Sequence, residues 1–222
     1  MASPTVGAST ITTDGSGASP YTSSQITTQS SGSAFFVVIA TSSGSTISSV
    51  TDSKSNTYSL VTTILEANDG VRLHLYGTEN GTGGASHDFT ANFSAGGGYG
   101  IGAIEVIGAP TSSVIDVTNT QYDQTSPFVC AVTTTEADTL LLAFIMTAQA
   151  GGGTFSVGGS FSIDQQASVA NPMAIASRAG ATATTYDPAW THSLYSAMAR
   201  ITIAVKSAGG GGTPNAIFYI KA

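Results

Sequence analysis

The chain of 222 residues is long enough for one large β-sandwich or two small domains, and its 41% apolar residues can form a substantial core. Only 9% of the residues are charged, while Ser (30), Thr (32) and Gly (26) are abundant, and this composition excludes coiled coils and long-helix proteins. The formal net charge of −7 leaves nothing to neutralise a row of phosphates, so nucleic acids and anionic membranes are excluded as expected partners.

Segments rich in Val, Ile, Thr and aromatic residues recur about every ten residues, separated by Gly, Asn, Asp and Ser. This spacing predicts an all-β fold, an antiparallel sandwich or barrel. Residues 1–33 alternate only weakly, and we expect one or two peripheral strands there. Ala34–Ala40 is uniformly apolar and is expected to be a strand buried on both faces. Gly70–Tyr76 alternates with period two, which indicates a half-buried strand.

The segment between these strands is expected to form a hairpin. Ser45–Val50 and Thr57–Leu65 flank the turn 51–56, and Asp52 and Asn56 are placed to hydrogen-bond the turn backbone. The turn also resembles part of a calcium loop, but Lys54 stands where a ligand oxygen would be needed, so calcium is not expected.

The second half of the chain continues the strand pattern, which gives about ten strands in all. The difficult segment is Glu136–Ala150, where helix formers are dense and a helix is the alternative to a strand. We favour a strand, because Thr133–Thr135 precede it and three glycines follow. Its unbroken apolar run would then place it at the centre of a sheet. The other expected strands are Asp88–Phe93, Ile101–Ile107, Phe128–Thr133, Phe155–Val157, Ala174–Ala179 and Ala199–Lys206.

The chain is divided into a β-sandwich domain over residues 1–207 and a C-terminal part over residues 208–222. Four glycines, Gly209–Gly212, make a flexible joint, and a short apolar segment follows it. Such an arm can add itself to the sheet edge of a neighbouring subunit, and the alternative is that it folds back onto its own domain. No internal repeat is predicted. The arm residues are Ala216, Ile217, Phe218, Tyr219 and Ile220.

No motif predicts catalysis, a cofactor or a metal. His74, His87 and His192 lie in no recognisable motif, and a Ser-His-Asp triad built from distant strands is the form of catalysis that the sequence leaves open. The glycines of residues 96–102 fail the strict nucleotide-binding pattern and are expected to form a loop that leads into a strand. The single cysteine, Cys130, lies in an apolar segment and is expected to be a core residue.

A carbohydrate site on a β-sandwich needs exposed aromatic rings with polar side chains nearby. Aromatic and polar residues gather in this way around residues 186–195. Tyr186, Trp190 and Tyr195 are therefore the candidate glycan contacts, and the alternative for Trp190 is a place in the core.

Low charge with abundant Ser, Thr and Gly is typical of extracellular adhesins and shells, yet residues 1–7 lack the basic and apolar regions of a secretory signal. A particle that assembles in the cytosol and leaves by lysis reconciles the two. Five short motifs also carry a resemblance to a known family. They are Ser49–Tyr58, Leu73–Tyr76, Ile104–Val106 with Val114–Val117, Thr134–Leu142, and Trp190 before Ala199–Lys206.

Over roughly residues 34–207 these motifs resemble a loose family of jelly-roll-like β-sandwich proteins, which occur as accessory virion proteins of tailed bacteriophages and as bacterial surface modules. Members usually have Gly where this chain has Ser55. The family pattern implies a tight turn with positive φ at this position, and Ser adopts positive φ less readily than Gly does.

The resemblance implies a non-enzymatic virion protein that assembles in the host cytoplasm, with other virion proteins and copies of itself as partners. It would be a capsid decoration protein or a tail appendage. The alternative is a carbohydrate-binding module that contacts a host glycan, and a weaker one is a glycan hydrolase with carboxylates from separate strands.

Overall fold

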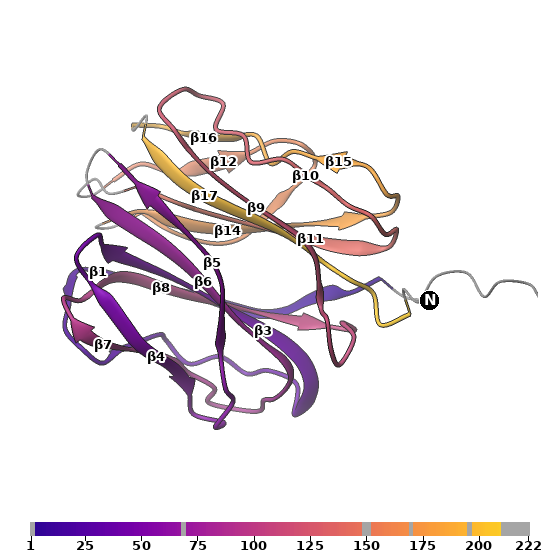
Figure 1. Cartoon of the computed structure of the whole chain (residues 1–222), viewed down its shortest axis with the longest axis horizontal. Coiled ribbons are helices and arrows are strands. Elements are labelled where there is room, and N and C mark those ends of the chain that lie inside the picture. The colour runs from indigo at the N-terminus through magenta and orange to yellow at the C-terminus, as the bar shows by residue number, and fades with distance from the viewer. Residues whose placement is uncertain (1–2, 68–69, 148–151, 169–170, 195–196, 210–222) are drawn as a thin grey trace, which may run out of the picture.

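The computed structural model describes residues 3–67, 70–147, 152–168, 171–194 and 197–209, apart from the side chains of residues 14–16, and every regular element in them is a β-strand (Figure 1). All strand pairs in this part of the chain are antiparallel, so the predicted all-β, antiparallel architecture is confirmed. The seventeen strands are β1 (Thr5–Gly17), β2 (Tyr21–Thr22), β3 (Ser31–Ser42), β4 (Thr46–Asp52), β5 (Ser59–Glu66), β6 (Val71–Thr82), β7 (Phe89–Ala95), β8 (Gly98–Ile107), β9 (Ile115–Asp123), β10 (Val132–Thr133), β11 (Thr139–Met146), β12 (Phe155–Val157), β13 (Ser162–Ala167), β14 (Met173–Gly180), β15 (Thr185–Tyr186), β16 (Trp190–His192) and β17 (Met198–Val205).

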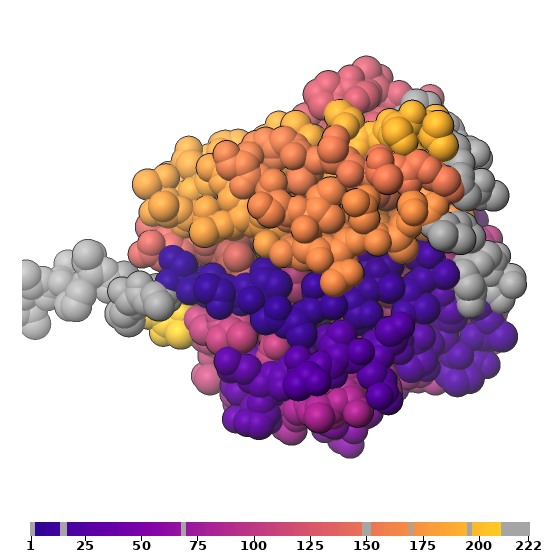
Figure 2. All heavy atoms as spheres, turned by 180° about the vertical axis from the view of Figure 1, so that it is seen from behind, coloured from indigo at the N-terminus to yellow at the C-terminus, as the bar shows by residue number. Residues whose placement is uncertain are grey.

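The strands form four layers. Inner sheet 1 has the order β1-β8-β3-β6-β5, and inner sheet 2 has the order β13-β14-β11-β17-β9. The two inner sheets pack face to face, with β1–β8 on one side of the molecule and β9–β17 on the other (Figures 1 and 2). The outer face of inner sheet 1 is covered by β2-β7-β4, and that of inner sheet 2 by the pairs β10-β15 and β12-β16.

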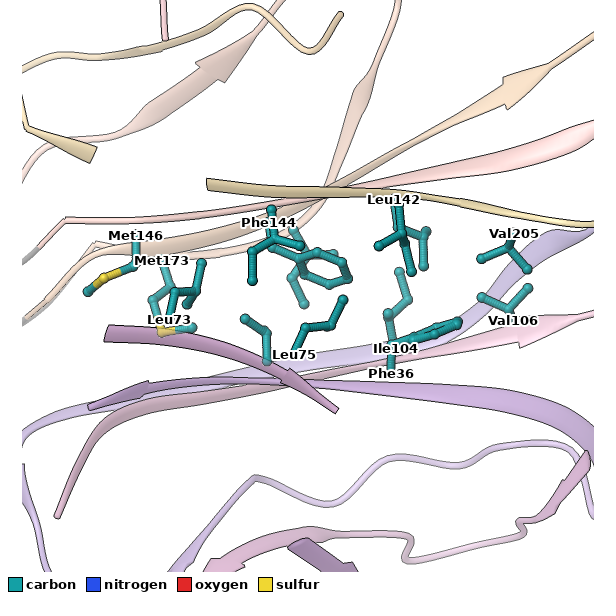
Figure 3. Close-up of a cluster of buried hydrophobic side chains, with 14 of the residues drawn as sticks. Phe36, Leu73, Leu75, Ile104, Val106, Leu142, Phe144, Met146, Met173 and Val205 are labelled. Carbon is teal, nitrogen blue, oxygen red and sulfur yellow. The ribbon is translucent and has the colours of Figure 1, made fainter. Parts of the chain in front are cut away.

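The central core lies between the two inner sheets and draws equally on both (Figure 3). Alternate residues of β3 (Phe36, Val38) point into it from one side, and alternate residues of β11 (Leu142, Phe144) from the other. The residues between them face the outer layers, as Phe35 does in the core beneath β2-β7-β4. β3 and β11 are therefore covered on both faces, which explains why their sequences are apolar without alternation.

The two sides of the molecule share one topology. The strands can be numbered from the start of each side, with β15 and β16 counted together as the seventh strand of the second side. Both inner sheets then have the order 1-8-3-6-5. In both sides the second and fourth strands pair with the seventh. The chain is thus an internal duplication, and we call β1–β8 repeat 1 and β9–β17 repeat 2. The prediction that no internal repeat exists is wrong.

The match extends to individual residues. Gly32 and Asp138 both have positive φ just before or at the start of the third strand of their repeat, and each is followed by a buried hydroxyl residue, Ser33 or Thr139. From there β3 and β11 run in step, so that Ala34, Phe36, Val38 and Ala40 correspond to Leu140, Leu142, Phe144 and Met146, all in the central core.

The irregular features also coincide. In the fifth strand a register shift separates Leu60 from Thr62 in repeat 1 and Ile163 from Gln165 in repeat 2. Each repeat also begins its second layer with a Ser-Pro-aromatic sequence, and the aromatic residue, Tyr21 or Phe128, is buried. A register shift at the same position in both repeats is stronger evidence of duplication than strand order alone, because a β-bulge is specific to one position in a strand.

Most expected strands are present at the expected places. Residues 136–150 contain the strand β11, third of five in its sheet, so the preference for a central strand over a helix is confirmed. The count of about ten strands is too low, because strands of two or three residues carry no periodic signal and because β9 and β13 are largely polar. The arm residues Ala216–Ile220 lie outside the described residues, so the boundary after residue 207 stays a prediction.

The predicted hairpin around residues 51–56 is wrong. β4 belongs to the outer layer and β5 to inner sheet 1, so the turn links two sheets instead of two paired strands. The two strands do flank a turn, and the turn lies at the expected residues. The sequence alone does not show whether the chain stays in one sheet after the turn or crosses to the next sheet.

The shared central core predicts that neither repeat is stable alone. We expect fragments 1–110 and 111–222, made separately, to aggregate, because each exposes its half of a core that includes Phe36 and Phe144. Made together, they should associate one to one and show the mass of the intact chain in light scattering. Two fragments that each remain soluble monomers, without binding each other, would contradict this.

Candidate functional site

A hydroxyl, an imidazole and a carboxylate lie in line in repeat 1. Thr28 Oγ1 is 3.0 Å from His87 Nδ1, and His87 Nε2 is 2.8 Å from Asp52 Oδ2. Thr28 lies between β2 and β3, His87 before β7, and Asp52 at the end of β4. The order of groups is that of nucleophile, base and orienting acid in a serine-protease-type triad, the kind of arrangement that the sequence left open.

The environment of these residues does not suit a reaction. The side chains of Asp52 and His87 are completely buried, and Thr28 is 7% exposed. The Thr28 hydroxyl oxygen already accepts the Gly84 N–H at 2.9 Å. Asp52 Oδ2 also accepts hydrogen bonds from Tyr58 Oη and Asn56 Nδ2, each at 2.7 Å. With its donors satisfied and no exposed face, the cluster joins three loops instead of presenting a nucleophile to a substrate.

Asp52 also organises the turn that follows it. Its Oδ1 accepts the backbone N–H groups of Lys54 at 2.9 Å and Asn56 at 3.0 Å, so the predicted turn hydrogen bonds are confirmed. Ser55 has φ of 66°, so the turn keeps a positive φ without a glycine. Burial alone would raise the pKa of Asp52, but the hydrogen bonds from Asn56, His87 and Tyr58 outweigh it and lower that pKa.

Repeat 2 closes the equivalent loops with simpler contacts. Thr134 exchanges hydrogen bonds with the backbone of Thr184 as Thr28 does with Gly84. Tyr186 takes the place of His87 in the strand pairing, and its hydroxyl bonds the backbone of Thr182. The same loops are therefore held without a His–Asp pair, which supports a structural role for that pair.

The candidate glycan contacts do not form an exposed platform. Trp190 is completely buried and packs edge to face on Phe155, with ring centroids 6.1 Å apart. Tyr186 is 3% exposed and belongs to the same core. Tyr195 lies outside the described residues. The glycan interpretation is thus wrong for Trp190 and Tyr186, because both are needed to fill the space between inner sheet 2 and its cover, and the core alternative for Trp190 is confirmed. Cys130 is likewise buried, as expected.

An exposed apolar feature lies elsewhere, on β5. Leu60 and Leu65 are 52% and 40% exposed, and β5 pairs with β6 on one side only, at the edge of inner sheet 1. Beside Leu60 is a groove of about 370 Å³ between β5 and the start of β9. The groove is lined by Phe36, Thr57, Ser59, Leu60, Val61, Gly77, Thr78, Glu79, Val114 and Ile115.

Glu79 fixes the end of this groove where β5 begins. Its two carboxylate oxygens accept the backbone N–H groups of Val114, at 2.9 Å, and Ser113, at 3.1 Å. These residues belong to the segment that joins the two repeats, so the carboxylate binds that segment to β6 and sets the groove width. We call the exposed side of β5 with this groove the β5 edge.

The equivalent strand of repeat 2 exposes less apolar surface. In the shared register Leu60 corresponds to Ile163, which packs against the core beneath β12-β16, and Leu65 corresponds to Ser168, while Val61 corresponds to Asp164. Polar side chains on an edge strand oppose pairing with other chains, and β5 has a smaller share of them than β13. Sequence alone does not reveal this site, because an exposed edge strand cannot be distinguished from a half-buried strand until the neighbours of β5 are known.

Within the described residues, no helix could span a membrane and no three His, Cys, Asp or Glu side chains gather as metal ligands. Comparison of the chain with protein-family models, curated proteins and solved structures gives no match.

The buried Asp52 predicts a large loss of stability on truncation. In Asp52→Ala the donors of His87, Tyr58 and Asn56 lose a buried acceptor, so we expect the free energy of unfolding to fall by about 3 to 5 kcal/mol in urea titrations. The control Asp88→Ala loses a single exposed hydrogen bond, from Gln25, and should change it by less than about 0.5 kcal/mol. Equal effects of the two would contradict the role given to Asp52.

His74 predicts a dependence of stability on pH. Desolvation, with a smaller contribution from the charge of Arg72, lowers the pKa of His74 from 6.5 to about 4. Between these pH values the unfolded chain binds a proton that the folded protein does not. The stability is therefore expected to fall as the pH drops from 6.5 to 4. In His74→Gln this fall should be smaller, as measured by the melting temperature across that range; an unchanged slope would contradict the assignment.

Proposed function

We propose that the protein is a non-enzymatic structural protein of a tailed-bacteriophage virion, a capsid decoration protein or tail appendage that assembles in the host cytoplasm. In this proposal it attaches to other proteins through the β5 edge. The observation that carries the proposal is the pair of exposed leucines, Leu60 and Leu65, on a strand with a free side. Exposed apolar edge strands promote association with further chains, and a protein that functions as a separate molecule would suppress them.

The strand order supports the same interpretation. We infer that each repeat is a jelly roll in which the fifth strand has joined the inner sheet, because the orders 1-8-3-6 and 2-7-4 are those of two interlocked Greek keys. Jelly rolls recur in viral shell proteins, and two of them fused through one core make a rigid block with free edges on both sides. This inference rests on the fold alone and is weaker than the one from the edge.

The charged residues of repeat 1 support a structural role as well. The buried carboxylate of Glu105 accepts hydrogen bonds from Ser33 Oγ at 2.7 Å and from the backbone N–H of Gln29 at 2.8 Å. With Asp52 and Glu79, it is one of three carboxylates that hold loops by their backbone or side-chain donors. The carbohydrate-binding alternative lacks this kind of support, because Trp190 and Tyr186 lie inside.

The proposal is tested on particles of the phage that encodes the chain. Virions banded in a density gradient should contain the protein by mass spectrometry. Leu60→Lys combined with Leu65→Lys should reduce its content at least tenfold, because two charges would be buried on docking. The control Leu194→Lys changes an exposed leucine after β16 and should leave the content unchanged. Absence of the wild-type protein from banded particles would reject the proposal.

A further inference from the structure

We propose that the β5 edge of one copy binds residues 216–220 of the C-terminal arm of a second copy, which adds itself to inner sheet 1 as an antiparallel strand. The inference rests on the proposed function, since it names a partner for the edge described there. It makes each copy both a donor of an apolar strand and an acceptor of one.

The chain leaves the described part of the fold at the end of inner sheet 1 where β8 ends and β5 begins. The backbone N–H of Lys206 donates to the Val114 carbonyl at 2.8 Å, and that of Ala208 donates to the Gly108 carbonyl at 3.0 Å. Val114 lines the groove, while Lys206 and Ala208 line a second, smaller hollow of about 210 Å³. The last described residue, Gly209, thus follows a residue bonded to the end of β8, which lies at the same end of inner sheet 1 as the start of β5, with β3 and β6 between the two strands.

The length and composition of the remaining chain suit the edge. Four glycines and Thr213-Pro214-Asn215 are followed by five apolar residues, Ala216–Ile220. Five residues in a strand span roughly 17 Å, which is close to the separation of the exposed residues Leu60 and Leu65 along β5. The Gly-rich joint carries no side chain that would restrict its path.

The duplication gives a reason why a strand that follows β17 would have to pair outside its own chain's inner sheets. The segment after β8 becomes β9, which lies beside β17 at the edge of inner sheet 2. The corresponding segment after β17 is the one that contains the arm, and its corresponding position, beside β8, is already filled by β1. In our proposal the arm therefore acts as an additional strand that pairs with a different edge.

The β5 edge is the apolar choice. At the opposite end of its own layer β1 is an edge strand mainly of Thr, Ser and Gly, whose Val6 and Ile11 pack against the central core, and β13 in repeat 2 carries Asp164, two glutamines and a packed Ile163. A strand of Ile, Phe and Tyr would bury its side chains against Leu60, Leu65 and the groove, and would leave them exposed beside the polar edges.

The direction of the strands favours a second copy over the same chain. An arm of the same chain would enter where β5 begins and run parallel to it. The arm of another copy can enter from the far end and pair antiparallel, as every described pair in this protein does and as is slightly more stable.

Full-length donor and acceptor variants test the proposal. Ile217→Asp with Phe218→Asp disables the arm, and Leu60→Lys with Leu65→Lys disables the edge. We expect dimers of the wild type in sedimentation equilibrium at micromolar concentration and monomers of each variant. A mixture of the two variants should form a heterodimer, because one retains an intact edge and the other an intact arm. The control Leu194→Lys should dimerise as the wild type does.

Three results would overturn the inference: a wild type that is monomeric at all concentrations, variants that still dimerise, or variants that fail to complement each other. Hydrogen exchange separates the causes. Protection of residues 59–66 that is lost in the arm variant but does not depend on concentration would show docking within one chain, and would also overturn it. If the edge variant is absent from virions while the arm variant is incorporated normally, this inference fails and the proposed function stands.

Discussion

The structure depends on one constraint: two inner sheets must each be covered on both faces. The central core between them buries side chains such as Phe36, Phe144 and Ile203, and the outer layers bury the alternate residues of the same strands. A strand such as β11 has no face toward water, and this accounts for eight consecutive buried residues. Because both repeats contribute equally to the central core, neither can lose its partner without exposing a full apolar face.

Local patterns in the sequence predict the strands well. They do not predict features that depend on residues far away in the sequence. The run of residues 139–146 is apolar without interruption, and it correctly indicates a central strand. The sequence does not decide whether the Trp190 side chain is buried or exposed, because a single large aromatic residue in a short strand has the same sequence pattern in both cases. Its burial is decided by Phe155 and Phe128, which lie far from it in sequence.

The duplication cannot be recognised from the sequence, and the reason is physical. Equivalent core positions need only to be apolar and to fill the space jointly, so Ala34 can face the core where repeat 2 has Leu140, and Ala40 where it has Met146. Residue identity is therefore lost at these positions while the pattern of burial is kept. The skeleton of the repeat survives: a register shift in the fifth strand, a threonine that closes a loop, and a positive φ before the third strand.

A comparison of the two repeats also distinguishes residues that serve the fold from residues that serve a function. Thr28 and Thr134 make the same hydrogen bonds in both repeats, so these bonds serve the fold. His87 is replaced by Tyr186, whose hydroxyl bonds the backbone of Thr182, so a tyrosine closes in repeat 2 the loops that the His87–Asp52 pair closes in repeat 1. The fifth strand differs in the opposite way: its pairing and its bulge are the same, but the partly buried Ile163 and Ser168 of repeat 2 are replaced by the exposed Leu60 and Leu65 in repeat 1. The fold gains nothing from exposed leucines, so the exposure of Leu60 and Leu65, where repeat 2 has a packed Ile163 and a serine, supports the proposal that this edge binds another chain.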